Sequence, residues 1–290
     1  MTAARTTVVI ATRNRATELT RTLTELTALR PPPPIVVVDN ASSDDSADRA
    51  SGFPGVRVVR LPRNLGATAR NIGVALSRTP YVAFSDDDSW WASDALHEAE
   101  RILDAHTDIG LVAAKTLVGE EEREDPVVPL MAESPLGTPD GLPGPAVLGF
   151  LACSAVVRRE AYLQVAGFSP VLHFGAEERL LSYDLAAHGW RLCYVDRVRA
   201  HHHPSSARPS RGRRERAELR NRLLITVMRR PVRRCLADGL RVLSRVPREP
   251  RVLGALAGAL RRLPSALAGR RPLPVRVERQ IRVLEHAQGG

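Results

Sequence analysis

The feature that most constrains the fold is an alternation of short apolar runs with segments of helical spacing. The first such segment places Leu19, Leu23, Leu26 and Leu29 on one helical stripe, with Thr17 positioned to cap its start. Strands that alternate with helices in this way form a parallel sheet flanked by helices. The first four expected strands are Thr6–Ala11, Ile35–Asp39, Val56–Arg60 and Tyr81–Ser85.

The alternation continues less regularly to residue 203. Here we expect a strand, an acidic loop rich in Pro and Gly, an apolar strand, two helices that each stop at a glycine, and two closing strands. In chain order these segments are Ile109–Val118, Gly119–Pro145, Gly149–Arg158, Arg159–Ala166, Ala176–His188, Arg191–Val195 and Arg199–His203.

After a polar linker at Pro204–Arg214, the pattern predicts three or four amphipathic helices. The expected turns between them lie near Pro231, Pro247, Pro264 and Pro272. The sequence therefore predicts an α/β domain with a mostly parallel sheet at residues 1–206, and an α-helical extension at residues 207–290.

The two parts differ in charge. The chain of 290 residues carries +10, but residues 1–203 sum to −6 and residues 204–290 to +16. The extension contains almost no cation other than arginine, and its basic amphipathic helices suit either of two roles. They can lie on an anionic membrane surface, or they can pack on the acidic first domain. The sequence leaves these two interpretations open.

Some classes of protein are disfavoured at this stage. No apolar run reaches the 18–20 residues of a membrane span, and Met1–Arg5 lacks the order of a signal peptide. We therefore expect a cytoplasmic protein, with peripheral attachment to the inner face of the membrane as an alternative. Cys153, Cys193 and Cys235 are far apart and form no CxxC pair, which argues against a disulfide framework or a thiolate zinc site.

Polar residues follow the ends of the first four strands. Ligands of an open parallel sheet bind outside the carboxyl ends of its strands. One polar turn is explained by turn formation alone, but four along one edge indicate a binding site. These segments are Thr12-Arg13-Asn14-Arg15, Asp39-Asn40, Arg63-Asn64 and Asp86-Asp87-Asp88.

The run Asp86-Asp87-Asp88 is the strongest of these signals. Three adjacent carboxylates repel one another, so without a cation at least one has a raised pKa or turns into solvent. Oxygen ligands suit a hard divalent ion such as Mg²⁺ or Mn²⁺, which also binds diphosphate oxygens. The chain lacks the GxxxxGK[ST], GxGxxG and GxSxG motifs, so P-loop, dinucleotide-binding and hydrolase-elbow interpretations have no support.

In order and spacing, four segments resemble the successive motifs of family 2 glycosyltransferases. They are Val8–Arg15 (VVIATRNR), Val36–Asp44 (VVVDNASSD), Asn64–Gly73 (NLGATARNIG) and Phe84–Ser89 (FSDDDS). The resemblance continues through Gly149–Phe168 and Gly175-Ala176-Glu177-Glu178 and fades after His203. It implies a GT-A fold, a nucleotide-diphosphate sugar donor, a divalent metal and inversion at the anomeric carbon.

The resemblance also implies roles for individual residues. Thr12 and Arg13 are expected to line the nucleotide pocket, and Asp39 to contact the base or ribose. The complete expected donor-binding set is Thr12, Arg13, Arg15, Asp39, Asn64, Arg70, Asn71, Asp86 and Asp87. The expected ligands of Mn²⁺ or Mg²⁺ are Asp88, Asp86 and His201.

Inverting transfer needs a carboxylate that removes the proton of the acceptor hydroxyl. The resemblance places Glu177-Glu178 in this position, with Glu178 as the expected base. A structural alternative is that the two acids stabilise the start of the following helix through its dipole. Leu180 replaces a usual aspartate, and the QxxRW motif of processive synthases is absent, so the expected enzyme adds a single sugar.

The histidine choice rests on strand geometry and on the resemblance. Side chains alternate along an extended segment, so His201 and His203 share a face and His202 points away. The resemblance assigns the metal-ligating histidine to His201, and a purely structural strand end is the alternative.

Two other functions compete with this one. A sugar nucleotidyltransferase shares the sheet topology and the metal, but such an enzyme needs a glycine-rich phosphate loop, and Ala11–Arg15 contains no glycine. A nucleic-acid-binding protein could use the arginine-rich extension on phosphates, yet residues 204–290 contain no aromatic side chain for base stacking. We therefore expect no nucleic-acid partner. The resemblance suggests a glycan or lipid-linked acceptor in bacterial cell-surface polysaccharide or glycolipid synthesis.

Overall fold

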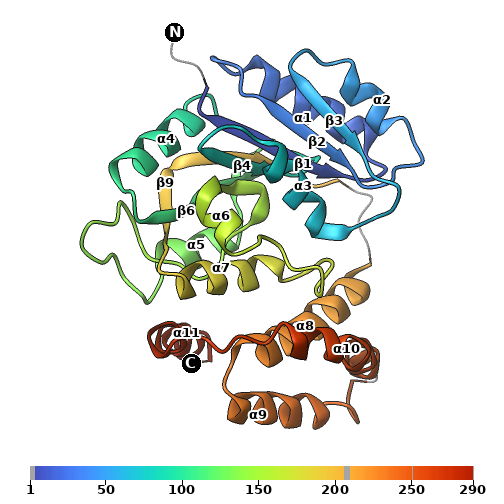
Figure 1. Ribbon diagram of the computed structural model, residues 1–290, viewed down its shortest axis with the longest axis vertical. Helices are drawn as coiled ribbons and strands as arrows, with labels where there is room; N and C mark the ends of the chain where they lie inside the picture. Colours follow the sequence, from blue (N-terminus) through green and yellow to red (C-terminus); the bar gives the residue numbers. More distant parts are fainter. Residues whose placement is uncertain (1–3, 206–209, 250, 290) are drawn as a thin grey trace.

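The computed structural model describes residues 4–205, 210–249 and 251–289. An α/β domain lies above a helical extension that is drawn in orange and red in Figure 1. The predicted fold class is thereby confirmed. The predicted domain boundary between residues 206 and 207 lies outside the described residues.

The first four strands form the parallel part of the sheet. They are β1 (Thr6–Thr12), β2 (Ile35–Asp39), β3 (Val56–Arg60) and β4 (Tyr81–Ser85). The neighbouring pairs β3–β2, β2–β1 and β1–β4 all run parallel, as predicted. Thr12 pairs with Asp39 and Ile10 with Ser85, so the polar residues after these strands share one edge of the sheet.

The other half of the sheet is mixed. Its strands are β5 (Ser89–Trp91), β6 (Ile109–Val118), β7 (Arg123–Glu124), β8 (Ala155–Arg158) and β9 (Arg191–His202). The order across the sheet is β3-β2-β1-β4-β8-β6-β9-β5, with β7 paired to β6. β8 runs antiparallel to both β4 and β6, whereas β9 runs parallel to β6. The expected parallel arrangement therefore dominates only the N-terminal half.

Five predicted segments differ from the structure. One is the linker predicted at Pro204–Arg214, whose residues from Arg211 on are helical. The two closing strands are one strand, β9, because the chain shifts register opposite Ala114 and Lys115 and then resumes its pairing with β6. The strand predicted at Gly149–Arg158 is reduced to β8, which a 3₁₀ turn precedes. The loop predicted at Gly119–Pro145 contains β7 and a short helix, α5 (Val127–Ala132).

Helices cover both faces of the sheet. They are α1 (Ala16–Ala28), α2 (Ser46–Ser51), α3 (Ala69–Leu76), α4 (Ala95–Ala105), α6 (Arg159–Gln164) and α7 (Glu177–Ala187). Because α1 begins at Ala16, Thr17 lies inside the first turn and does not cap it; Arg15 occupies the cap position.

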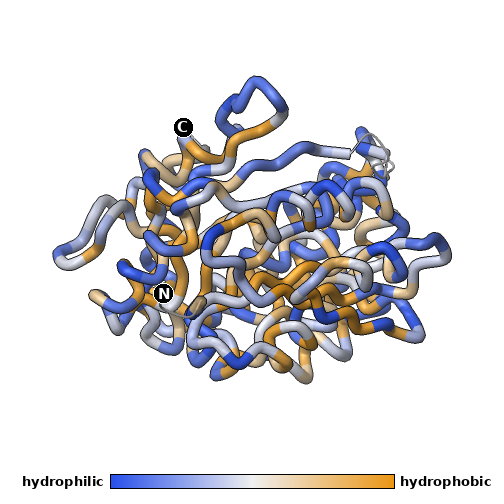
Figure 2. The backbone as a smooth tube through the Cα atoms, turned by 90° about the horizontal axis from the view of Figure 1, so that it is seen from above, coloured by the Kyte–Doolittle hydropathy of each residue, from blue (hydrophilic) through white to orange (hydrophobic). Residues whose placement is uncertain are grey.

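Alternate side chains of the strands enter two separate cores. Val8 and Ile10 pack with the buried faces of α1 and α4, whereas Val9 and Phe84 pack with side chains from α3 and α7. Figure 2 shows the hydrophobic stretches running through the interior, with hydrophilic segments toward the periphery. Burial on both sides explains why these strands are apolar runs without alternation.

The extension consists of four helices, in agreement with the sequence pattern. They are α8 (Arg211–Arg229), α9 (Val232–Leu243), α10 (Arg251–Ala268) and α11 (Val275–Gly289). Pro231 and Pro272 lie between helices as predicted, but Pro264 lies inside α10 and marks no turn. In the described part of the chain, no helix combines the length and the apolar character that crossing a membrane requires.

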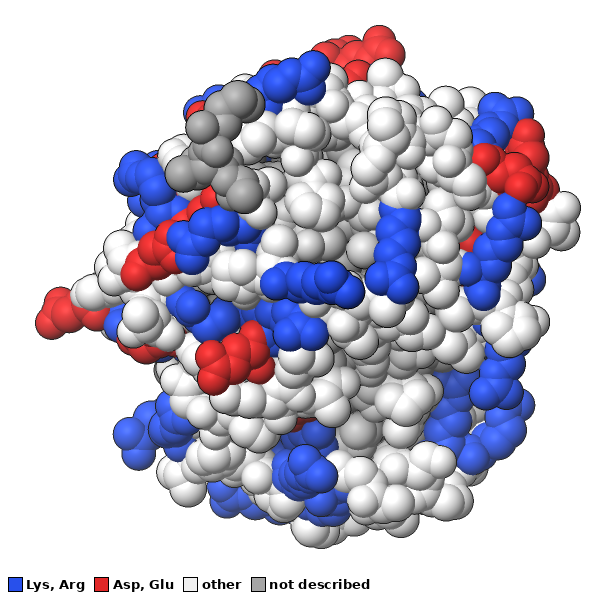
Figure 3. Space-filling model, turned by 45° about the horizontal axis from the view of Figure 1, so that its top comes forward, with Lys and Arg blue, Asp and Glu red and all other residues white. Residues whose placement is uncertain are grey.

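The extension packs on the α/β domain. Leu224, Ile225 and Met228 of α8 belong to the same core as α7. Buried Arg229 donates from Nη2 to Oδ2 of Asp184 in α7 at 2.9 Å. On the face shown in Figure 3, blue cationic side chains are scattered, and red carboxylates lie beside several of them. Of the two roles considered for the extension, packing on the α/β domain is therefore one that it has.

Candidate active site

A cavity of about 580 Å³ opens at the carboxyl edge of the parallel strands. Part of its wall comes from the ends of β1 and β4, and part from the loop around Gly66. The remaining parts come from α8 and from residues after β2, on α3, before α7 and at the end of β9. Of the residues predicted to bind the donor or the metal, those that line the cavity are Thr12, Arg13, Arg15, Asn64, Arg70, Asp86, Asp87 and Asp88.

The three aspartates after β4 have different surroundings. Asp86 accepts a hydrogen bond from the guanidinium of buried Arg70. Thr12 Oγ1 donates to Oδ2 of Asp87 at 3.0 Å. Burial, followed by the charges of Asp86 and Asp88, raises the pKa of Asp87 to about 7. Repulsion within the run, which the sequence analysis predicted, thus adds to the effect of burial on this pKa.

Asp88 faces the end of β9. Its Oδ1 lies 3.3 Å from Nε2 of His202, and its Oδ2 accepts the backbone N–H of Ser205 at 3.0 Å. Both Asp88 and His202 line the cavity. A carboxylate oxygen and an imidazole nitrogen that lie side by side are two ligand atoms that suit Mn²⁺. Among the described residues, no three side chains of His, Cys, Asp or Glu form a complete metal-binding group.

The structure does not bring His201 to Asp88, because the histidine beside Asp88 is His202. The Nδ1 atom of His201 lies 3.3 Å from Oε1 of Glu122, and its ring stacks on that of Trp90 with 5.8 Å between centroids. The predicted alternation is confirmed, because His203 stacks on the same indole ring at 4.6 Å. Strand β5, which the sequence analysis missed, pairs with this end of β9 and covers the face of His201.

Two asparagines shape the cavity wall around Gly66. Asn40 donates from Nδ2 to the Gly66 carbonyl at 3.0 Å and accepts the Leu65 N–H at 2.7 Å. Asn64 accepts the Gly66 N–H at 2.8 Å. Gly66 has a φ of +63°, and a Cβ there would collide with the carbonyl oxygen of His173, so this turn requires glycine. Asn40 is a lining residue that the sequence analysis quoted but did not assign to the site.

Asp39 lies just behind this wall. Its carboxylate is buried, and Oδ2 accepts the N–H of Ser42 at 3.2 Å. Its Oδ1 has no hydrogen-bond partner among the described residues. A buried acceptor without a partner is costly unless a ligand satisfies it. Asp39 thus keeps one buried acceptor atom without a partner beside the cavity wall, and its contact with the nucleotide stays a prediction.

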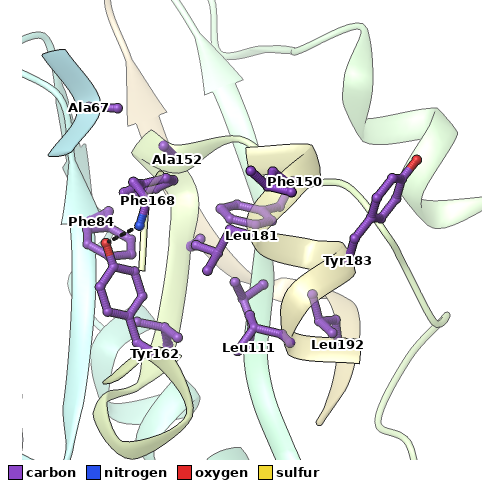
Figure 4. Close-up of a cluster of buried hydrophobic side chains, with 14 of the residues drawn as sticks. Ala67, Phe84, Leu111, Phe150, Ala152, Tyr162, Phe168, Leu181, Tyr183 and Leu192 are labelled. Atoms are coloured by element: carbon purple, nitrogen blue, oxygen red, sulfur yellow. Dashed lines mark hydrogen bonds between the residues drawn. The ribbon is translucent and has the colours of Figure 1, made fainter. Parts of the chain in front are cut away.

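Asn71 differs from the other residues that were expected to bind the nucleotide-sugar donor. Its Nδ2 donates to the Phe168 carbonyl at 2.9 Å, and its Oδ1 accepts the Phe168 N–H at 3.0 Å and the hydroxyl of Tyr162. Figure 4 shows Tyr162 and Phe168 beside Phe84 in the core beneath the site, with a hydrogen bond between them. The side chain of Asn71 is therefore occupied by the core, and its expected role in nucleotide binding is corrected to a structural one.

The two arginines after β1 differ in how they are held. Arg13 is exposed at the cavity wall. Arg15 lies 3.4 Å from the carboxylate of Glu18 and hydrogen-bonds to Ser205, the residue whose N–H binds Asp88. Arg15 thereby connects the start of α1 to the chain that follows β9.

Glu177 and Glu178 begin α7, next to the cavity but not among its lining side chains. Burial, followed by the charge of Glu177, raises the pKa of Glu178 to about 8, and burial also raises the pKa of Glu177. Both carboxylates act electrostatically on Arg70, as does Asp86. Arg70 therefore joins the aspartate run and the glutamate pair in a single electrostatic unit. The position of the pair at a helix start also fits the structural alternative, and the two roles are compatible.

The extension contributes residues that the sequence analysis missed. Arg213, Arg214 and Arg220 of α8 line the cavity. Buried Asn221 donates to the carbonyls of Leu172 and Phe174, in the loop that leads to Glu177. Since the family motifs end before the extension, only a tertiary structure reveals these contacts. The one feature of the sequence that could have indicated these contacts is Asn221, a polar residue within the apolar stripe of a basic helix.

Comparisons with known proteins give the family and the fold of this chain. The family model described as "Glycosyl transferase family 2" matches residues 7–165. A curated relative, the pre-mycofactocin glycosyltransferase of Mycobacterium tuberculosis, is 33% identical over 199 residues, which are 65% of this chain and 40% of the relative. The chain thus spans about two fifths of the length of that relative.

Solved structures share the fold at low sequence identity. Staphylococcus aureus TarS 1–349 in complex with UDP-GlcNAc has a TM-score of 0.58 at 17% identity, covering 77% of this chain and 66% of its own. The mannosyltransferase PcManGT from Pyrobaculum calidifontis, in complex with GDP-Man and Mn²⁺, has a TM-score of 0.57 at 21% identity. That match covers 98% of this chain and 79% of PcManGT, so it includes the helical extension.

Proposed function

Because this chain belongs to glycosyl transferase family 2, we propose that it transfers one sugar, with inversion, from a nucleotide-diphosphate sugar to an acceptor hydroxyl. It is a glycosyltransferase with a GT-A fold. The observation that supports the detailed proposal is the cavity at the carboxyl edge of the sheet, where Arg70 hydrogen-bonds to Asp86 and interacts electrostatically with the glutamate pair. Family membership disfavours the sugar nucleotidyltransferase and nucleic-acid-binding alternatives.

The metal belongs to this proposal. Asp88 and His202 would hold Mn²⁺ or Mg²⁺, with Asp86 beside them, and they offer the oxygen and nitrogen donors that such ions accept. When bound, the ion neutralises the charge that develops on the departing diphosphate. Solved relatives of the same fold contain Mn²⁺, which supports the assignment.

The chain's own residues supply the remaining chemistry. Glu178 takes the proton of the acceptor hydroxyl, and the hydroxyl oxygen bonds to the anomeric carbon. At the same time the bond from that carbon to the diphosphate oxygen breaks, and the nucleoside diphosphate leaves with the electron pair. Arg70 balances the carboxylates on both sides of the reaction, and Thr12, Asp39 and Asn64 hold the nucleotide.

A donor-binding panel tests this function. UDP-, dTDP- and GDP-sugars are added with Mn²⁺ or with EDTA, and the melting temperature is measured. A ligand at a hundred times its Kd stabilises the fold by about 2.7 kcal/mol, which corresponds to a shift on the order of 5–10 °C. We expect one nucleotide class to give this shift only with the metal. A flat response to every donor contradicts the proposal.

Part of the extension also suits a membrane surface, and we propose that it contacts anionic lipid near a glycan or lipid-linked acceptor. Val232, Leu236, Leu240 and Leu243 recur at helical spacing on α9, and their side chains are 55–68% exposed. This α9 stripe lies on a helix with several arginines. Apolar side chains with cationic neighbours are typical of helices that lie on anionic bilayers. A role in cell-surface polysaccharide or glycolipid synthesis follows from such an acceptor.

Liposome flotation tests this contact on the full chain, because removing the extension would expose the core that α8 shares with α7. We expect the wild type to float with phosphatidylglycerol vesicles but not with phosphatidylcholine vesicles. The double variant Leu236→Gln/Leu240→Gln should lose most of this binding because its stripe is polar. Leu130→Gln/Leu163→Gln, at exposed positions outside the extension, is the control. Equal flotation of both double variants would refute the α9 contact.

A further inference from the structure

The wall that α8 adds to the cavity carries positive charge without matching acids. Arg213, Arg214 and Arg220 line the cavity, and within the described ranges none of them has a carboxylate partner. Other arginines of the extension are paired, for example Arg229 with Asp184 and Arg230 with Glu278. We call the three cavity arginines the α8 wall.

Arg220 is held in place at this wall. Its Nη2 donates to the carbonyl of Leu172 at 3.0 Å, and its stem packs on Gly258 of α10, where a Cβ would lie only 3.0 Å from Cδ of Arg220. Burial and the charges of Arg262, Arg261 and Arg216 lower its pKa to about 10. Four guanidinium groups therefore lie close together around Arg220, and Arg220 is the one among them that lines the cavity. Such crowding favours an anion in the cavity beside them.

Charge matching indicates which anion is missing. Six arginines line the cavity, and two of them have acidic partners: Arg15 lies 3.4 Å from Glu18, and Arg70 hydrogen-bonds to Asp86. The three arginines of the α8 wall have no such partner within the described ranges. A nucleotide-diphosphate sugar carries two negative charges, and a divalent cation offsets both. A donor that binds together with its metal therefore leaves the positive charge of the α8 wall unmatched. A second anionic group is needed to balance it.

We infer that the α8 wall binds a phosphate group on the acceptor, so that the acceptor is a phosphorylated alcohol or glycan. This inference rests on the proposed function, because it takes the second substrate of the transferase as the source of the anion. Arg213 and Arg214 are the exposed contacts, and Arg220 is the half-buried one. Arg13, at the end of β1, faces the same cavity from the donor side.

The test is a titration with phenyl phosphate, used as a probe for a phosphate monoester. Wild-type protein is first saturated with Mn²⁺ and with the nucleoside diphosphate that the donor panel identifies. We expect phenyl phosphate to bind in addition to the nucleotide. Arg213→Gln/Arg214→Gln should weaken this binding at least tenfold, because two charge-assisted hydrogen bonds are lost, and should change nucleotide affinity less than twofold. Arg220 is left intact because it also holds the loop at Leu172.

The matched control is Arg233→Gln/Arg241→Gln, which removes the same charge from α9, outside the cavity. It should leave the phenyl phosphate affinity within twofold of the wild type. The inference is overturned if phenyl phosphate does not bind, if both double variants bind it equally, or if it displaces the nucleotide. Displacement would assign the α8 wall to the donor diphosphate. If no nucleotide binds, the proposed function fails, and the same titration of nucleotide-free protein still tests the α8 wall.

Discussion

Glu178→Gln is expected to lower the rate of sugar transfer by about 10²–10⁴-fold while donor affinity stays within twofold. The amide has nearly the shape of the carboxylate but cannot take a proton from the acceptor hydroxyl. Steady-state transfer and thermal-shift measurements on one preparation check the two halves of this prediction. Glu160→Gln, an exposed change on α6, is the control. Full activity of Glu178→Gln would move the base to another carboxylate, with Glu177 the nearest candidate.

The same residue predicts a dependence of activity on pH. Burial and the charge of Glu177 raise the pKa of Glu178 to about 8, and a general base acts only when it is ionised. Wild-type transfer should therefore rise about tenfold per pH unit below 8 and level off above it. The residual activity of Glu178→Gln should lack this rise. A wild-type profile that is flat from pH 6 to 9 would contradict the assignment of the base.

The raised pKa also predicts a stability effect of known sign. The folded state binds the Glu178 proton more tightly than the unfolded state, so stability falls as pH rises from the ordinary value of 4.5 to about 8. Glu178→Gln removes this titration. The variant should melt at a higher temperature than the wild type at pH 8, and the difference should shrink toward pH 5. Differential scanning calorimetry at the two pH values measures it.

Asp88→Ala is expected to abolish the metal-dependent part of donor binding. Asp88 is the carboxylate that meets His202 at the cavity, so its removal leaves the imidazole without the oxygen donor beside it. In the donor panel the variant should give the same small shift with Mn²⁺ as with EDTA. Its transfer rate should fall by at least about a hundredfold, because charge on the leaving diphosphate is no longer offset.

Asp88 also accepts the backbone N–H of Ser205, so a loss of folding must be separated from a loss of metal. Asp88→Asn keeps an oxygen acceptor for that N–H but is a weaker ligand. We expect it to melt close to the wild type without donor and to lose the metal-dependent shift. Asp140→Ala, an exposed change in the loop before β8, is the control. A full metal-dependent shift in Asp88→Asn would place the ion elsewhere.

Local patterns determined much of the site. Each parallel strand is an apolar run, and the polar residues that follow these strands lie at the same edge of the sheet. Thr12 and Asp86-Asp87-Asp88 were therefore placed together before any tertiary information. The repulsion within the aspartate run was also predictable, because charge density along a few residues does not depend on distant parts of the chain.

The choice between His201 and His202 and the role of Asn71 could not be predicted from local patterns. Alternation along β9 correctly separated His201 from His202, but it does not say which face meets Asp88. That choice depends on β5, a three-residue strand more than a hundred positions away, which covers His201. Asn71 lies in a motif, yet its partners Tyr162 and Phe168 come from a distant segment and turn it into the core.

In the extension, too, the sequence determined the local structure but not the contacts between distant segments. Its helices, their basic character and three of its four expected turns were determined by the sequence, because helical period and proline are local signals. That α8 shares a core with α7, clamps the loop before Glu177 through Asn221 and adds arginines to the cavity was decided only by the tertiary structure. The spacing of apolar residues in a sequence shows which face of a helix is buried. It does not show which other element that face packs against, because that contact forms between segments that are distant in the sequence.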